Sequence, residues 1–402
     1  MGNWKTCTIG DLGRVVGGAT PSTKKAENYD GGTIAWITPK DLAGFSGRFI
    51  SRGERNITEQ GLKSCSTQLM PAHTVLFSSR APIGYIAIAE QEVCTNQGFK
   101  SVVPDEKTDY MFLYYLLKYN KEKIENLGSG TTFKEVSGST MRGIEVRVPE
   151  TIEEQQRIAS VLSALDDKIE KNTEVNENLL QQVIALYEHL LQDDGWPIVT
   201  ILDVAEKVAM GPFGSNIKVS TFVPEGVPII SGNHLRGYFL EEPEFNYITE
   251  AHAERLKNSI VFPHDLIFTH AGNIGQVAMI PDGCKYERYV LSQRQFYLRC
   301  DETKVVPEFL LMFFHSTSGQ HELLSYANQT GVPSIAQPAT NLKKIPFKCP
   351  PIQEQLRWQE QVHPLLGRYL NNRMENEKLS SLRDVLLPQL MSGELDVSDL
   401  DL

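Results

Sequence analysis

The sequence predicts an α+β protein in which two similar globular units are separated and followed by long helices. Three observations support this fold class. The chain has 402 residues, which is more than one hydrophobic core usually serves. One motif returns after 200 residues, and a seven-residue apolar spacing follows each copy. We expect a first unit at 1–150, a helix at 151–193, a second unit at 194–350, and a second helix with a C-terminal tail at 351–402.

The repeated motif opens each long helix. Ile152–Arg157 (IEEQQR) returns as Ile352–Arg357 (IQEQLR). Each copy follows a proline-bearing stretch and carries acidic residues in its first turn, which suits a helix start. Upstream the repeat is looser: Trp4–Asp11 resembles Trp196–Asp203. The repeat therefore extends over most of the chain, with loops of different length.

Apolar residues recur every seven positions along both helical segments, which indicates a coiled-coil seam. In the first segment these are Ile158, Leu162, Leu165, Ile169, Leu179, Val183, Leu186 and Leu190; in the second they are Trp358, Val362, Leu365, Tyr369, Leu379, Leu386 and Leu390. At about 1.5 Å per residue, the stretch 158–190 spans roughly 50 Å. Pro364 stands where the first copy has Ala164, so we expect the second helix to be kinked or locally broken there.

Four asparagines interrupt this seam. Asn172 and Asn176 stand where leucine or isoleucine is expected, and Asn372 and Asn376 repeat the exception. Residue 174 is the midpoint of the stretch. Antiparallel pairing about it would bring Asn172 towards Asn376 and Asn176 towards Asn372, in a pseudo-two-fold arrangement. A buried asparagine layer costs stability and fixes register; the alternative is that all four lie on a solvated face.

The globular units read as mixed α/β with short strands. Strand-like runs at 33–37, 74–77 and 83–88 are bounded by glycine, proline and serine. We expect one helix at 110–119 and its counterpart at 307–315.

Composition limits the possible classes of protein. The formal net charge is −11, which is unusual for a DNA-binding protein, but the segments 151–193 and 351–402 carry −6 and −4 of it. The two larger units are close to neutral. The six cysteines are scattered without metal-ligand spacing, and no window is apolar enough to span a membrane. We therefore expect a cytoplasmic protein with reduced thiols, no bound metal and no membrane partner.

No catalytic signature is present. The sequence lacks a phosphate-binding loop, a dinucleotide fingerprint, a nucleophile elbow and an H-E-x-x-H zinc motif. The acidic run at 104–107 is a weak nuclease lead whose plain interpretation is a solvated turn. Two alternatives stay open: an autonomous methyltransferase or nuclease with unrecognised motifs, and a coiled-coil assembly scaffold that does not bind DNA.

The double motif, its spacing and the closing segment Leu386–Leu395 (LLPQLMSGEL) resemble the specificity subunits of Type I restriction–modification systems. The resemblance covers essentially the whole chain. It implies two target-recognition domains, each reading one half of a bipartite, asymmetric site in double-stranded DNA. It also implies that the two helices form an antiparallel spacer, which docks methyltransferase subunits. Those partners would carry S-adenosylmethionine, a separate motor subunit would cut DNA, and this chain would have no catalytic residue and no cofactor.

Loops after strands offer the best candidates for DNA contacts, because arginine reads guanine while asparagine and glutamine read adenine. The alternative is ordinary solvated side chains, or structural roles for the two histidines and Asn273. In the first unit the candidates are Lys40, Ser78, Ser79, Arg80, Gln97, Lys100, Thr132 and Lys134; in the second they are Asn233, His234, Arg236, His270, Asn273, Gln293, Arg294 and Gln329.

Overall fold

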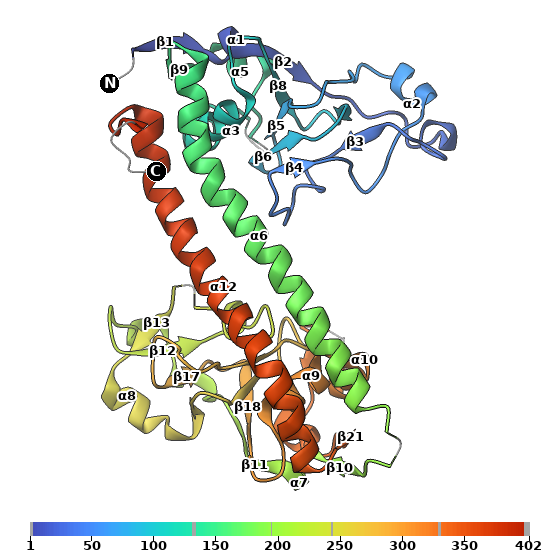
Figure 1. Ribbon diagram of the computed structural model, residues 1–402, viewed down its shortest axis with the longest axis vertical. Helices are drawn as coiled ribbons and strands as arrows, with labels where there is room; N and C mark the ends of the chain where they lie inside the picture. Colours follow the sequence, from blue (N-terminus) through green and yellow to red (C-terminus); the bar gives the residue numbers. More distant parts are fainter. Residues whose placement is uncertain (1–2, 131–133, 194, 243, 329–330, 398–402) are drawn as a thin grey trace. The chain divides into compact units, whose positions relative to one another are not determined.

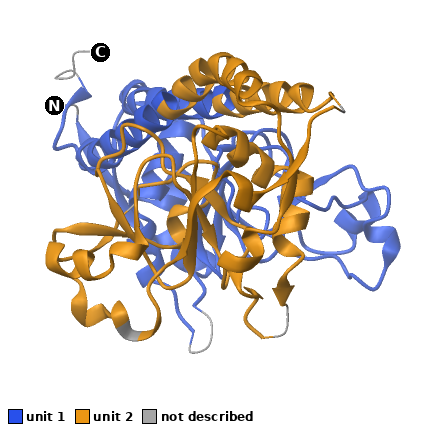
Figure 2. Ribbon diagram, turned by 90° about the horizontal axis from the view of Figure 1, so that it is seen from below, with its two compact units in different colours: residues 1–175, 371–402 blue, residues 176–370 orange. Residues whose placement is uncertain are grey.

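The computed structural model describes residues 3–130, 134–193, 195–242, 244–328 and 331–397. The chain divides into two compact units, one made of residues 1–175 with 371–402 and the other of residues 176–370 (Figure 2). Each unit therefore contains one predicted globular region together with one half of each long helix.

Unit 1 is built around a five-stranded sheet, with helix α3 packed on strands β5 and β6. The sheet order is β2 (Gly13–Gly17), β8 (Lys100–Pro104), β5 (Val75–Ser79), β6 (Ile83–Ala89) and β4 (Phe49–Ile50). Two strand pairs complete it: β3 (Ala35–Ile37) with β7 (Val93–Thr95), and β1 (Trp4–Thr8) with β9 (Glu145–Pro149). Its short helices are α1 (Ile9–Leu12), α2 (Glu59–Lys63), α3 (Tyr110–Tyr119), α4 (Lys121–Asn126) and α5 (Gly138–Gly143).

Unit 2 contains two four-stranded sheets. One has the order β11 (Ala205–Met210), β18 (Gln295–Cys300), β15 (Leu266–Thr269) and β16 (Val277–Met279); the other has β13 (Asn246–Ile248), β12 (Val227–Ile230), β17 (Tyr289–Leu291) and β14 (Ile260–Val261). The strand pairs are β10 (Ile198–Thr200) with β21 (Pro346–Lys348), and β19 (Ala327–Asn328) with β20 (Ser334–Ile335). The short helices are α7 (Ile201–Val204), α8 (Glu250–Arg255), α9 (Pro307–His315), α10 (Thr317–Leu324) and α11 (Pro338–Leu342).

The strand order of one unit returns in the other. The order β2-β8-β5-β6 of unit 1 corresponds to β11-β18-β15-β16 of unit 2. The match extends to single backbone conformations: Gly84 has φ 93° and Gly275, its counterpart, has φ 89°, values that favour glycine. The strands expected at 33–37, 74–77 and 83–88 are confirmed by β3, β5 and β6, and the helices expected at 110–119 and 307–315 coincide with α3 and α9. The mixed α/β class is therefore correct.

The glutamine of the repeated motif has the same structural role in both units. The side chain of Gln155 accepts a hydrogen bond of 3.0 Å from the backbone N–H of Asp109, the residue before α3. Gln355 accepts one of 3.0 Å from Val306, the residue before α9. Both glutamines are buried, so each amide satisfies polar backbone groups inside its unit. The motif thus attaches the long helix to the short helix of the same unit.

The long helices are α6 (Ile152–Leu190) and α12 (Ile352–Ser392), shown green and red in Figure 1. In unit 1 the first half of α6 shares a core with the last half of α12, through Ile158, Leu162 and Leu390. In unit 2 the last half of α6 shares a core with the first half of α12, where Tyr187 lies 6.3 Å from Trp358 between ring centroids. In each unit the two helix halves run in opposite directions.

We expected a kink or a local break at Pro364. The break is wrong, because α12 continues through this residue as one helix of 41 residues; the kink stays a prediction. Proline at 364 leaves the carbonyl of Glu360 without its helical partner. Glu360 and Pro364 are both exposed, so this carbonyl can be hydrated. The neighbouring Val362 and Leu366 are buried in the core of unit 2, and this packing offsets the cost of proline in the helix.

Candidate nucleic-acid interface

In unit 1 two candidate residues gather around one carboxylate. Arg80, directly after β5, places its Nη1 3.4 Å from Oε2 of Glu135, and Lys100, at the start of β8, places its Nζ 3.3 Å from Oε1. The Arg80 side chain is 35% exposed. An ion pair that is this accessible contributes little stability. The Lys100 side chain is less accessible, at 15% exposed. Glu135 therefore positions both cations and holds Arg80 only weakly.

Ser78 and Ser79 lie behind this cluster with no exposed surface. The Ser78 hydroxyl donates to the carbonyl of Pro82 at 2.8 Å and accepts from the N–H of Tyr85 at 2.8 Å. The Ser79 hydroxyl donates to the carbonyl of Gly98 at 3.2 Å. These hydroxyls stabilise the turn between β5 and β6 and the neighbouring loop, and they offer no surface to a ligand.

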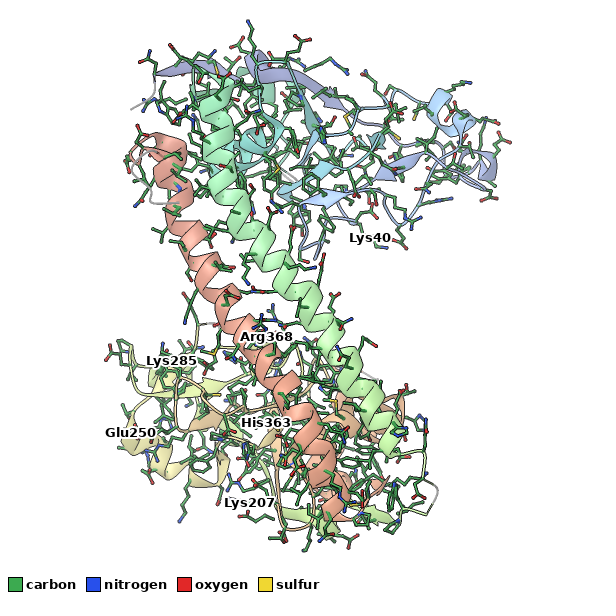
Figure 3. All side chains as sticks on the ribbon, in the orientation of Figure 1. Lys40, Lys207, Glu250, Lys285, His363 and Arg368 are labelled. Atoms are coloured by element: carbon green, nitrogen blue, oxygen red, sulfur yellow. The ribbon has the colours of Figure 1, made fainter. Side chains whose placement is uncertain are left out.

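The other described candidates of unit 1 are exposed. Lys40 projects from the loop after β3 and pairs with Glu54 at 2.7 Å (Figure 3). Gln97 accepts a hydrogen bond from the hydroxyl of Thr20, which ties two loops of the unit together. Lys134 is exposed beside Glu135, and Thr132 lies outside the described residues.

Unit 2 has a polar cavity of about 280 Å³, lined by residues that follow β12, β15 and β17. Three candidates, Asn233, Asn273 and Arg294, line it, and all three are exposed. The structure thus brings together residues that lie up to 61 positions apart in the chain. Their amide and guanidinium groups can form the paired hydrogen bonds that base edges require.

The floor of this cavity consists of polar residues that the sequence analysis missed: Thr269, Gln276, Ser292 and Gln295. Thr269 and Gln295 are buried. A signal for them existed, because a threonine closes the otherwise apolar run Leu266–Thr269 and a glutamine opens the apolar run Gln295–Leu298. Polar residues within buried strands need hydrogen-bond partners, so their presence indicated a polar network.

Two of the remaining candidates hold loops in place. His234 is buried, its ring stacks on Phe245 with centroids 4.4 Å apart, and its Nδ1 accepts from the N–H of Ser231 at 2.9 Å. Burial lowers the pKa of His234. The amide of Gln293 donates to the carbonyl of Ile217 at 2.7 Å. These contacts attach two loops to the unit.

His270 donates through Nε2 to the carbonyl of Gln293 at 3.1 Å, and burial lowers its pKa as well. Both histidines therefore have the structural surroundings that the sequence left open as an alternative. Arg236 is exposed, and Gln329 lies outside the described residues.

Across the described ranges, no group of three or more histidine, cysteine, aspartate or glutamate side chains is placed to hold a metal ion. No described helix has the length and apolar character needed to cross a membrane. All six cysteines are free. Asp105, part of the weak nuclease lead, accepts a hydrogen bond of 2.8 Å from the hydroxyl of Thr108, as expected for a turn.

Most of the chain matches the model of one known protein family. A family model described as the Type I restriction modification DNA specificity domain matches residues 1–181 and again residues 193–382. The chain belongs to this family. As a Type I specificity subunit it is a non-catalytic component of a restriction–modification complex, in which it takes part in recognising the DNA target.

Individual proteins that this chain resembles are Type I specificity subunits as well. The MjaIX specificity subunit of Methanocaldococcus jannaschii is 32% identical, over 99% of this chain and 95% of its own. The EcoR124I/EcoR124II specificity subunit of Escherichia coli is 30% identical over 42% of each chain. The crystal structure of a Type I S subunit from M. genitalium has the same fold, with a TM-score of 0.60 at 16% identity over 97% of this chain and 96% of that one.

Proposed function

We propose that the two units each read one half of a bipartite, asymmetric site in double-stranded DNA. The observation that carries this proposal is one strand order that occurs twice with different side chains at matching loop positions. Arg80 of unit 1 corresponds to Ala271 of unit 2, and Pro82 corresponds to Asn273. Two units that share one strand order but differ in their loop residues are expected to recognise two different DNA sequences.

We assign the DNA contacts to the candidates that are at least partly exposed, apart from His270 and Gln293, whose side chains bond to backbone carbonyls. In this set, arginine and lysine meet phosphates or guanine, while asparagine and glutamine read adenine. In unit 1 the set is Lys40, Arg80, Gln97, Lys100 and Lys134; in unit 2 it is Asn233, Arg236, Asn273 and Arg294. The buried or loop-fixing candidates Ser78, Ser79, His234, His270 and Gln293 position these residues. Thr132 and Gln329 stay predictions.

We further propose that α6 and α12 form an antiparallel coiled coil about a pseudo-two-fold axis, which separates two recognition domains at 1–150 and 194–350. A spacer of roughly 50 Å exceeds one turn of DNA, about 34–36 Å. Unread base pairs would therefore lie between the half-sites. The helices at 151–193 and 351–402 would dock the methyltransferase subunits, which carry S-adenosylmethionine, and through them the motor subunit, in the cytoplasm.

A domain exchange tests the two-reader proposal. Residues 1–150 are replaced by the first unit of another family member, and methylated bases are mapped across the genome of cells that contain the partner methyltransferase. We expect one half of the methylated motif to change and the other half to stay. A change in both halves would contradict independent readers.

A mobility-shift assay addresses the remaining alternative, a scaffold without DNA contacts, which the net charge of −11 favours. The complex with the methyltransferase is titrated with a duplex that contains the mapped motif and with a scrambled duplex. We expect tighter binding of the motif. Equal binding of both duplexes would favour the scaffold.

A further inference from the structure

The polar side chains at the floor of the unit 2 cavity form one chain of hydrogen bonds, in which each residue donates to the next. The hydroxyl of Ser292 donates to Oε1 of Gln295, and Nε2 of Gln295 donates to the hydroxyl of Thr269 at 3.5 Å. The same threonine hydroxyl donates to Oε1 of Gln276 at 3.1 Å. The carbonyl oxygen of Gln276 is therefore occupied, and its amide orientation is set by the chain of donors behind it.

The other end of the Gln276 amide remains available. Among the described residues, none accepts a hydrogen bond from its Nε2, which carries two N–H donors. Arg294 lines the same cavity, is exposed and carries donors only. Gln276 at the floor and the more exposed Arg294 therefore both present donors to a ligand in the cavity.

Glycine at position 232 keeps this floor open. A Cβ atom added there would lie 3.2 Å from Oε1 of Gln276 and 3.7 Å from Nε2 of Gln295. The first distance is shorter than ordinary van der Waals contact. Any larger side chain at Gly232 would therefore occupy the space in front of the two glutamines.

Among the four bases, only guanine presents two acceptors, N7 and O6, and no donor on its major-groove edge. Adenine presents one acceptor beside a donor, thymine presents one acceptor, and cytosine presents a donor. We propose that this cavity reads a guanine in the half-site of unit 2, with Gln276 and Arg294 as its two donors. The inference rests on the DNA recognition proposed above and makes Gln276 a specificity-determining residue.

A backbone phosphate is also an acceptor, but the composition of the cavity favours a base. Among the described residues that line it, Arg294 is the one cationic side chain, and the other polar ones carry amides and hydroxyls. Phosphate contacts rely on positive charge and carry no sequence information. A fixed, uncharged amide suits a base edge better.

The test uses the complete complex of this chain with its methyltransferase and DNA. The methylated motif is first mapped for the wild type. Gln276→Glu replaces the two donors by acceptors, and Gly232→Ala narrows the floor without touching either donor. Asn258→Asp, at an exposed position of the same unit, makes the same amide-to-carboxylate change away from the cavity. Binding is then measured on the mapped duplex and on its single-base replacements, and thermal melting verifies that each variant folds.

We expect Gln276→Glu and Gly232→Ala each to reduce the preference for guanine at one position of one half-site, by about 5- to 150-fold. Asn258→Asp should leave the motif unchanged. Uniform weakening on all duplexes with a shallower salt dependence would overturn the proposal in favour of a phosphate contact. A folded Gln276→Glu variant with the wild-type motif would also overturn it. If the wild-type complex itself had no preferred motif, the proposed function would fail first.

Discussion

The side-chain amide of Asn172 donates a hydrogen bond of 2.9 Å to the side-chain carbonyl of Asn376, within unit 1. This is the pairing that the midpoint of the apolar stretch predicts. Asn172 also donates to Glu375 at 2.7 Å, and Asn376 donates to the carbonyl of Ile169 at 3.3 Å. Asn172, Asn176 and Asn372 are buried, so a solvated face does not describe these positions. We propose that this pairing fixes the register of the helices, because a buried amide is satisfied only opposite another polar group.

We predict that replacing all four asparagines by leucine raises the melting temperature and alters the spacing between the methylated half-sites. The apolar layer would gain buried area, while the polar constraint on register would be lost. By contrast, Asn172→Leu alone should lower stability by about 1–3 kcal/mol, because the side-chain carbonyl of Asn376 then loses its donor. Melting curves and motif mapping measure both effects. Unchanged stability together with an unchanged motif in the fourfold variant would refute the register hypothesis.

The sequence was most informative where its signal is periodic or repeated. The long helices, helix α3 and helix α9 were predictable because apolar spacing and the 200-residue repeat specify them. The polar floor around Gln276 was not, because it joins residues from separate strands. At Ser78 and Ser79 the opposite holds: serine after an apolar run predicts a loop surface, but strand β5 continues through both residues and buries them. Which loop residues face outward depends on tertiary packing.

Glu135 gives a pair of opposite predictions for DNA binding. Arg80→Ala should weaken binding of the cognate duplex by about 1–3 kcal/mol if Arg80 contacts guanine in both acceptor positions, and by less if it meets only phosphate. Glu135→Gln should strengthen binding to unrelated duplexes, because Arg80 and Lys100 lose their shared carboxylate and can neutralise phosphates instead. Titrations at several salt concentrations measure both. Binding that neither change affects would remove this cluster from the interface.

Arg48 attaches the loop before β4 to helix α6 within unit 1. Its guanidinium is 5% exposed and bonds to Asp167 and, at 2.9 Å, to Glu170. We predict that Asp167→Asn with Glu170→Gln destabilises unit 1 by about 3 kcal/mol, because a buried cation is left without a counter-charge. Arg48→Met should destabilise unit 1 by less, since the two carboxylates that it leaves unpaired are more exposed and can be hydrated. Denaturant unfolding distinguishes the two.

The exposed pair between Lys40 and Glu54 provides the control for this comparison. Both side chains are more than two thirds exposed, and ion pairs this exposed contribute little to stability. Lys40→Met and Glu54→Gln should therefore leave the unfolding midpoint almost unchanged. Equal losses from the buried and the exposed pair would show that Arg48 does not anchor its loop.

His264 links the stability of unit 2 to pH. Its Nε2 lies 3.0 Å from Oδ2 of Asp282 and its Nδ1 lies 3.3 Å from Oε1 of Glu302. Burial lowers the pKa of His264, but the two carboxylates outweigh burial and the net shift is upward. A raised folded-state pKa adds stability that is complete below the unfolded pKa of about 6.5 and is lost as the pH rises through the folded value.

We therefore predict that the wild type loses this stabilisation as the pH rises above about 6.5, and that His264→Gln shows a smaller loss over the same interval. His315 acts in the opposite direction, because burial lowers its pKa, so its contribution is lost as the pH falls and it persists in the variant. Denaturant unfolding at a series of pH values measures the difference, with His252→Gln on α8 as the control for losing a histidine. If His264→Gln and the wild type have parallel profiles from pH 6 to 8, the two carboxylates do not hold a protonated ring. A steeper loss in the variant would reverse the sign of the argument and point to a neutral His264 in the folded state.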